Sequence, residues 1–309
     1  STALVRNPTK MPDAKASAFK DLIQPFKIED LGVRGRLVRL GPTVEAILGP
    51  HDYPRAVAEM MGQTLTLTAM LASALKFDGI FKIQTQGDGP LSLMVADMTH
   101  DGALRGYARF DEQGIAALGD SGTATLPRLI GKGRMAVTVD HGANSQQQQG
   151  ITELAGPTLA ACAQTYFRQS EPLETVISLA ASSTRAAGLM IQRLPPEEGA
   201  GHLEGRDLDD EWRRAAALSG SVTADELLNS ELLPGELLYR LFHQDGVRLF
   251  KTRSVRHSCR CSKDKVKATL ASFSRDDIDS MAEDGRIAVT CEFCKSDYVF
   301  EGKGLTELY

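Results

Sequence analysis

The chain has 309 residues, of which 42% are hydrophobic and 24% are charged, and its formal net charge is -5. The length suggests two or three domains. The acidic balance argues against a nucleic-acid-binding protein, which needs an excess of basic residues. The first twenty residues contain no apolar run typical of a secretory signal. We therefore expect a soluble cytoplasmic protein without a membrane segment.

The N-terminal part of the chain predicts a flexible arm followed by a core domain. Residues 1–25 show no periodicity and are expected to form the arm. Residues 35–40 alternate apolar and charged side chains, which predicts a half-buried strand. Residues 42–48 predict a short helix. Residues 54–75 predict a long helix whose polar interruptions indicate burial in a protein core rather than in a membrane.

A strand-rich block follows and completes a mixed α/β core domain over 26–195. Strands are predicted over 80–86, 91–96, 104–110, 134–140 and 188–192, a polar strand or loop over 146–151, and a helix over 157–169. Residues 173–182 fit either a strand or a buried helix. Cys162 lies on the apolar face of the predicted helix, which favours a buried small side chain over a reactive thiol.

The composition changes at Pro195-Pro-Glu-Glu-Gly, and a helical linker is expected over 196–250. Between Glu197 and Glu236 there are eleven acidic and three basic residues. The apolar residues of this segment occur in short helical groups that include Trp212, Leu227, Leu228, Leu232 and Leu233. Short helices are weak without tertiary packing, so the linker should be stable only when it is docked on another part of the protein.

Four of the five cysteines lie within 36 residues, as Cys259-x-Cys261, a gap of 29 residues, and Cys291-x-x-Cys294. Reducing compartments keep thiols reduced, so clustered cysteines in a cytoplasmic chain indicate metal or redox chemistry. Residues i and i+2 of an extended segment face the same side, and a Cys-x-x-Cys turn likewise points two sulfurs at one centre. Zinc favours four thiolates in a tetrahedron. The spacing therefore predicts one zinc ion per chain in a small C-terminal domain over 251–309.

The segments around the cysteines predict two short helices, over 263–273 and 276–281, and a hairpin around the second cysteine pair. Four ligands leave no position for a catalytic water, which disfavours hydrolytic metal catalysis. A four-thiolate site is either inert or oxidisable, because thiolates react with peroxide and hypochlorous acid. Oxidation would remove the ligands and unfold a small domain whose folding energy is metal affinity. The spacing alone leaves an inert zinc ribbon and a redox switch both open.

Seven motifs occur in order between about Val33 and Phe300. They are Leu75-Lys-Phe-Asp-Gly, Gln86-Gly-Asp-Gly-Pro-Leu, Arg105-Gly-Tyr-Ala-Arg, Tyr166-Phe-Arg-Gln-Ser-Glu, Arg240-Leu-Phe-His, Cys259-Arg-Cys-Ser and Cys291-Glu-Phe-Cys. Together they resemble the heat shock protein 33 family of redox-regulated holdase chaperones. The resemblance implies an α+β fold in three parts, namely a core domain, a helical linker and a zinc domain, and this agrees with the boundaries above.

The resemblance also implies a mode of action. The reduced, zinc-bound form is expected to be dormant, and oxidation is expected to pair Cys259 with Cys261 and Cys291 with Cys294 and to release zinc. The linker should then become disordered, and the protein should form a homodimer and hold unfolding client proteins without ATP during oxidative stress. Client binding needs exposed apolar area. The candidates are Trp212, Leu227, Leu228, Leu232 and Leu233 of the linker, and the core face that they leave behind.

Two other classes of function fit parts of the sequence. A zinc-ribbon nucleic-acid-binding protein would use the basic residues Arg253, Arg256, Arg260, Lys263, Lys265 and Lys267, although a solvated face suits the acidic chain better. An enzyme would need a recognisable catalytic motif, and neither a phosphate loop nor a nucleophile elbow is present. A thiol oxidoreductase based on Cys291 and Cys294 would require zinc to be dispensable. We therefore expect a protein that is not an enzyme.

Overall fold

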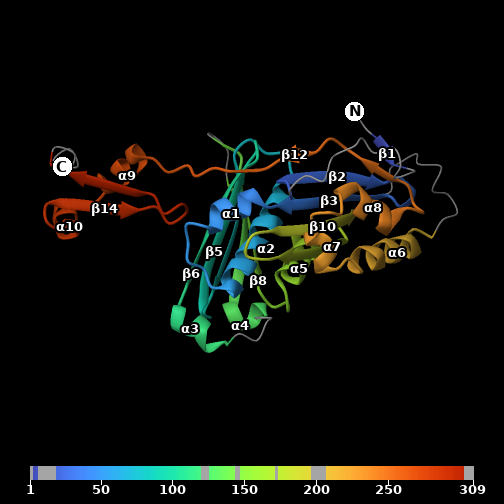
Figure 1. Cartoon of the computed structure of the whole chain (residues 1–309), viewed down its shortest axis with the longest axis horizontal. Helices are drawn as coiled ribbons and strands as arrows, with labels where there is room; N and C mark the ends of the chain where they lie inside the picture. Colours follow the sequence, from blue (N-terminus) through green and yellow to red (C-terminus); the bar gives the residue numbers. More distant parts are fainter. Residues whose placement is uncertain are drawn as a thin grey trace. The chain divides into compact units, whose positions relative to one another are not determined.

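The computed structural model describes residues 3–5, 19–119, 125–142, 147–170, 173–195 and 207–302 (Figure 1). The chain forms two compact units, Ser1–His257 and Ser258–Tyr309. Both units combine helices with sheets, so the expected α+β class is confirmed. Most of the predicted arm, the first part of the predicted linker (196–206) and the last seven residues lie outside the described residues.

The first unit contains two sheets, of which one has seven strands. Its strands lie in the order β1-β11-β2-β3-β10-β9, with β12 beside β2, and every neighbouring pair is antiparallel. Their bounds are Ala3–Val5 (β1), Leu22–Ile28 (β2), Val33–Leu40 (β3), Thr175–Ala181 (β9), Ala186–Arg193 (β10), Val247–Leu249 (β11) and Arg253–Ser254 (β12). The segment 173–182, for which the sequence left strand and helix open, therefore supplies strand β9.

The second sheet of this unit has six strands in the order β13-β6-β5-β4-β7-β8. Their bounds are Ile80–Gly87 (β4), Leu91–Thr99 (β5), Ala103–Phe110 (β6), Gly133–Asp140 (β7), Gln148–Glu153 (β8) and Arg256–His257 (β13). Strand β13 is parallel to β6, and the other pairs are antiparallel. The strands predicted between 80 and 140 are confirmed, and the polar segment near 148 is a strand.

Helix α2 (Arg55–Ala72) contacts both sheets and lies at the centre of the largest hydrophobic core. The hydroxyl groups of Thr64, Thr66 and Thr68 are buried and donate to carbonyls four residues earlier, at 2.8 to 2.9 Å. These bonds satisfy the polar atoms inside the core, so the buried helix expected over 54–75 is confirmed. The other helices of this unit are η2 (Glu29–Leu31), α1 (Pro42–Leu48), α3 (Glu112–Ala117), α4 (Leu126–Ile130), α5 (Leu159–Ser170), α6 (Leu208–Gly220), α7 (Ala224–Leu228) and α8 (Pro234–Phe242).

Two parts of the range expected as a flexible arm are strands in the structure. Residues 3–5 pair with β11, and β2 begins at Leu22. Phe19 and Ile23 are buried, and the Asp21 carboxylate accepts hydrogen bonds from the backbone N–H groups of Gly41 and Thr43, at 2.8 and 2.9 Å. The strand pattern is weak here because Pro25, which lacks an N–H group, lies inside the strand.

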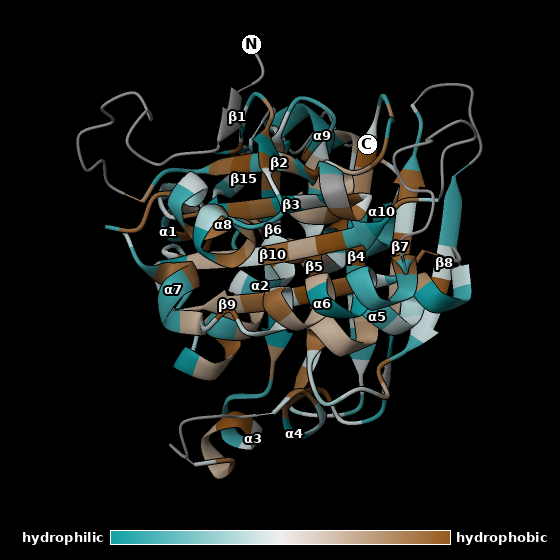
Figure 2. Ribbon diagram, turned by 90° about the vertical axis from the view of Figure 1, so that its right-hand side faces the viewer, coloured by the Kyte–Doolittle hydropathy of each residue, from teal (hydrophilic) through white to brown (hydrophobic). Residues whose placement is uncertain are grey.

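Helices α6, α7 and α8 cover one face of the seven-stranded sheet (Figure 2). Their buried side chains form a second hydrophobic core with the strands. This core includes Phe26, Leu37, Leu189 and Ile191 from the sheet and Trp212, Leu227, Leu232, Leu237, Leu238 and Phe242 from the helices. Some of the acidic residues cap these helices: Asp207 accepts from two backbone N–H groups at the start of α6, and Thr223 and Glu226 form a capping box at α7. The acidic composition thus stabilises short helices.

Strand β3 is buried on both faces, which corrects the expected half-buried strand. Helix α2 contacts it on one side, while Leu37 belongs to the core under α6, α7 and α8 on the other. Arg39 is only 4% exposed, whereas a half-buried strand would turn its charged side chains toward solvent. The prediction was wrong because the linker helices, which are distant in the sequence, cover the face on which Arg39 lies.

The second unit consists of α9 (Lys263–Leu270), α10 (Arg275–Met281) and the hairpin β14 (Arg286–Thr290) and β15 (Asp297–Glu301). These elements confirm the two helices and the hairpin predicted from the sequence. Its core contains four buried apolar side chains, Leu270, Ile278, Ile287 and Phe300. So small a core rarely stabilises a domain without a disulfide or a metal.

Candidate metal centre

The four clustered cysteines come from two loops of the second unit. Cys259 and Cys261 precede α9, whose first turn is capped by Ser262. Cys291 and Cys294 lie in the turn between β14 and β15, which is closed by hydrogen bonds between Cys291 and the backbone of Lys295 and Ser296, at 2.8 and 2.9 Å. Lys295 has a φ of 55°, in the left-handed region that such a turn requires.

The four sulfur atoms converge on one point. All of them lie within 4.8 Å of one another. The Sγ atoms of Cys259 and Cys291 are 3.8 Å apart, and those of Cys261 and Cys294 are 3.4 Å apart. Zinc–sulfur bonds of about 2.3 Å in a regular tetrahedron place sulfurs about 3.8 Å apart. The cluster therefore has the size and the donor set of a four-thiolate zinc site.

The thiols do not have equal acidity. Desolvation raises the pKa of the Cys261 thiol to about 12, and it also raises the pKa of Cys291. Desolvation acts in the same direction on Cys294, but hydrogen bonds with the side chain and backbone of Ser296 and with the sulfurs of Cys261 and Cys259 together outweigh it and lower the pKa of that thiol to about 6. A divalent cation favours the deprotonated form of all its thiol ligands, since only thiolates bind it.

Two neighbours of the sulfur atoms were not identified from the sequence. The hydroxyl group of Tyr298 donates to Sγ of Cys261 at 3.0 Å, and Ser296 Oγ lies 3.3 Å from Sγ of Cys294. The bond to Cys261 raises the pKa of Tyr298 to about 12. Ser296 and Tyr298 lie two and four residues after Cys294. The alternation of β15 places Tyr298 on the same side as the buried Phe300, so the sequence pattern could have indicated that Tyr298 points inward.

The other candidate residues of the sequence lie in the first unit. Trp212, Leu227 and Leu232 are buried, and Leu228 and Leu233 are half-buried, so none of them is freely exposed in this conformation. Cys162 is 1% exposed in α5, where burial raises its pKa and Gly156 donates a backbone hydrogen bond to its sulfur at 3.3 Å. This confirms its expected place in the core.

The basic residues that would serve a nucleic-acid-binding protein make contacts within the chain. Arg253 donates to the carbonyls of Ser73 and His100, and Arg256 donates to Asp101. Lys265 donates to the carbonyl of Arg260 at 2.8 Å. The ammonium group of Lys263 lies 5.5 Å from the centre of the Phe300 ring. These contacts give most of the cluster a structural role.

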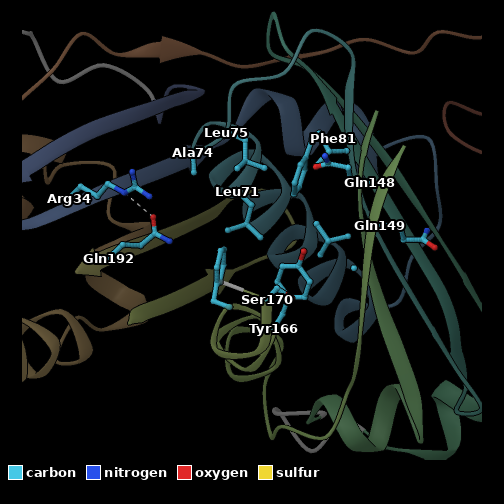
Figure 3. A pocket seen from close by; sticks show the side chains of 14 residues that line it. Arg34, Leu71, Ala74, Leu75, Phe81, Gln148, Gln149, Tyr166, Ser170 and Gln192 are labelled. Carbon is cyan, nitrogen blue, oxygen red and sulfur yellow. Dashed lines mark hydrogen bonds between the residues drawn. The ribbon is translucent and has the colours of Figure 1, made fainter. Parts of the chain in front are cut away.

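A cavity of about 360 Å³ lies beside the C-terminal end of α2 (Figure 3). Leu71, Leu75 and Phe81 line its apolar part, and Arg34 donates to Gln192 at 3.2 Å on its polar side. Carboxylates, histidines and cysteines are not among its described lining residues. The described lining therefore lacks the side chains that usually act as a general base near neutral pH.

Within the described part of the chain, no helix has both the length and the apolar character needed to cross a bilayer.

Comparison with known proteins assigns the same regions to one family. The family model described as Hsp33 protein matches residues 21–301. The chain is 38% identical over 297 residues to the 33 kDa chaperonin of Caulobacter vibrioides, covering 92% of this chain and 96% of the relative. It is 39% identical over 293 residues to the 33 kDa chaperonin of Nitrosococcus oceani, covering 94% of each. The crystal structure of the 33 kDa chaperonin (heat shock protein 33 homolog) from Thermotoga maritima shares the fold, with a TM-score of 0.79 and 22% identity over 93% of this chain and 97% of that chain.

Proposed function

Because this chain belongs to the Hsp33 family of chaperones, we propose that it is a redox-regulated holdase that binds unfolding proteins without ATP. The observation that carries the proposal is the convergence of four thiols in a unit whose described residues, 258–302, include four buried apolar side chains. The folding of such a unit depends on the metal ion that its thiols bind. We place the protein in the cytoplasm, where thiols remain reduced until oxidative stress.

In the resting state, Cys259, Cys261, Cys291 and Cys294 would hold one zinc ion as thiolates. The bound ion would supply a closed structural centre rather than a Lewis acid, since four thiolates fill a tetrahedral shell. The Tyr298 hydroxyl would orient the sulfur of Cys261, and Ser296 that of Cys294. This form is proposed to be dormant.

Activation would consist of two disulfide bonds, Cys259–Cys261 and Cys291–Cys294. With hydrogen peroxide, one thiolate of a pair attacks a peroxide oxygen, which gives a sulfenic acid and hydroxide. The second thiol of the pair attacks the sulfenic sulfur, which forms the S–S bond and releases water. Each disulfide consumes one peroxide, and two pairs remove all four thiolate ligands. The pairing comes from the family resemblance, and the sulfur positions, all within 4.8 Å, are compatible with it.

Loss of the metal centre would be transmitted to the linker helices along the chain. Only β11, β12 and β13 and short connections separate α8 from Cys259. When the second unit unfolds, this segment loses its fixed end, and short helices such as α7 and α8 are weak without packing. Their release would expose Trp212 and the linker leucines together with the sheet face beneath them, and would allow homodimer formation.

The test is client aggregation followed by light scattering, with the reduced zinc-loaded protein and the peroxide-treated protein compared at equal concentration. Suppression is expected only after treatment, together with the release of one zinc ion per chain and the two disulfides found by peptide mapping. The Cys162→Ser variant, which keeps the four clustered thiols, is the matched control and should behave like the wild type. Equal suppression by both states, or none in either, would contradict the proposal.

A further inference from the structure

The sheet face under the linker helices is mainly apolar but also carries charged side chains. The register of β2, β3, β10 and β11 places Phe26, Ile28, Leu37, Leu189, Ile191 and Val247 on this face, all of them buried. On the described strands of this face, the charged side chains are two arginines, Arg39 near one end and Arg193 at the other. This face therefore combines an apolar floor with positive charge.

The two arginines differ in their partners. Arg193 donates to the carboxylates of Glu174 and Asp209, each at 2.6 Å. Arg39 donates to the backbone carbonyl of Leu232 at 2.6 Å and to that of Glu226 at 3.5 Å, and its Nε has no hydrogen-bond partner. Among the described residues, no carboxylate pairs with Arg39.

A second guanidinium lies close to the same end of the face. Arg39 and Arg185 are both placed over the ring of Phe19, at 5.2 and 5.3 Å from its centre. Within the described part of the chain, Arg185 also has no ion pair. Two cations therefore lie beside an aromatic ring, and no described anion neutralises their charge.

Over residues 207–250, the described part of the linker, no carboxylate completes this site. Glu226 caps α7 through Thr223, and Glu236 accepts from the backbone N–H of Leu233 at 3.1 Å. Asp209 binds Arg193 at the far end of the face. Among its described residues, the linker thus offers Arg39 two backbone carbonyls, which accept hydrogen bonds from the terminal N–H groups but do not neutralise the positive charge.

In the proposed function, clients bind this face once the linker has left it; we propose that the face selects apolar segments carrying carboxylates, and that Arg39 is the residue that makes the selection. The inference rests on the proposed function, since the linker must leave before a client can enter. A carboxylate from the client would form a charge-assisted hydrogen bond with Arg39, which the described linker residues do not provide. Apolar client side chains would replace those of α7 and α8. Arg39 would therefore favour binding of an acidic client to this face over binding of the linker.

The test uses two fluorescein-labelled peptides that share the same leucine and phenylalanine positions and differ only in having glutamate or glutamine elsewhere. Their binding to the oxidised full-length protein is measured by fluorescence anisotropy. The wild type should bind the glutamate peptide about tenfold more tightly, which corresponds to one charge-assisted pair of about 1.4 kcal/mol. Arg39→Met should bind both peptides equally. Arg34→Met, on the same strand but on the opposite face, should keep the preference.

A second variant separates failure of this inference from failure of the redox mechanism. The full-length Leu237→Ser/Phe242→Ser protein removes two fully buried linker contacts, one of them to Phe26, and should release the linker without oxidation, as seen in Trp212 emission. The binding of the glutamate and glutamine peptides is then compared for the Leu237→Ser/Phe242→Ser protein with and without Arg39→Met. Equal binding of the two peptides, a preference that survives Arg39→Met, or no binding by the opened protein would overturn the inference. Opening of this variant combined with zinc retention in the peroxide-treated wild type would instead contradict the redox mechanism alone.

Discussion

The hydroxyl group of Tyr298 donates a hydrogen bond of 3.0 Å to Sγ of Cys261, so a side chain outside the thiol cluster fixes one member of it. Groups that bond to metal ligands orient them, and their loss typically lowers metal affinity about 10- to 100-fold. We predict that Tyr298→Phe lowers zinc affinity by about tenfold in competition with a chromogenic chelator. Tyr239→Phe, in α8, is the control and should leave zinc affinity unchanged. Equal affinities for Tyr298→Phe and the wild type would mean that the bond does not orient Cys261.

Replacing a single cluster thiol should weaken metal retention much more. Cys259→Ser and Cys291→Ser each remove one of four converging sulfurs, and a serine hydroxyl is a poor ligand for zinc. After dialysis, both variants should contain well under one zinc ion per chain by atomic absorption. Cys162→Ser should keep a full equivalent, because Cys162 lies in the core of the first unit. A full equivalent in Cys259→Ser would remove Cys259 from the ligand set.

Removal of zinc by a chelator under reducing conditions should unfold the second unit alone. Its four buried apolar side chains cannot offset the conformational entropy of the chain, whereas α2 lies in a core of several dozen residues. Hydrogen exchange should therefore become fast in α9, α10, β14 and β15 and stay slow in α2. Continued protection of β14 and β15 in the metal-free protein would show that the small core suffices.

Trp212 is the only tryptophan in the chain and reports on the linker directly. It is 8% exposed in α6. Oxidation that releases the linker should shift its emission to longer wavelength, with a time course that follows zinc release. Reduction in the presence of zinc should reverse the shift. An unchanged spectrum after confirmed zinc loss would show that α6 stays docked.

Arg39→Met should dock the linker more tightly in the reduced protein. Burial lowers the pKa of Arg39 to about 10, which means that docking disfavours its cation. Methionine removes that penalty, and the lost hydrogen bonds to Leu232 and Glu226 oppose the gain only partly, because the second is long and Nε already lacks a partner. Exchange of the α8 amides should slow by about tenfold, which corresponds to about 1.4 kcal/mol. Faster exchange than in Arg34→Met would show instead that Arg39 holds the linker in place.

The elements and the thiol cluster were predictable because their signals are local. Two closely spaced cysteine pairs have few arrangements that satisfy zinc, and the alternation over 80–86 and 134–140 marks strands within single windows of sequence. The buried state of Arg39 could not be predicted in the same way. It depends on Glu226 and Leu232, nearly two hundred residues away, and an arginine in an alternating strand normally faces water. Strand β2 was missed because Pro25 interrupts its pattern.

The small core of the second unit also bears on the return to the resting state. In the proposed cycle, a unit whose described core has four buried apolar side chains would not refold when only its disulfides are reduced, nor when only zinc is supplied. On the proposed mechanism, recovery therefore requires two signals at once, electrons for the sulfurs and a metal ion for the thiolates. A cell that has restored its reductant but has its zinc bound elsewhere would keep the chaperone in its open form.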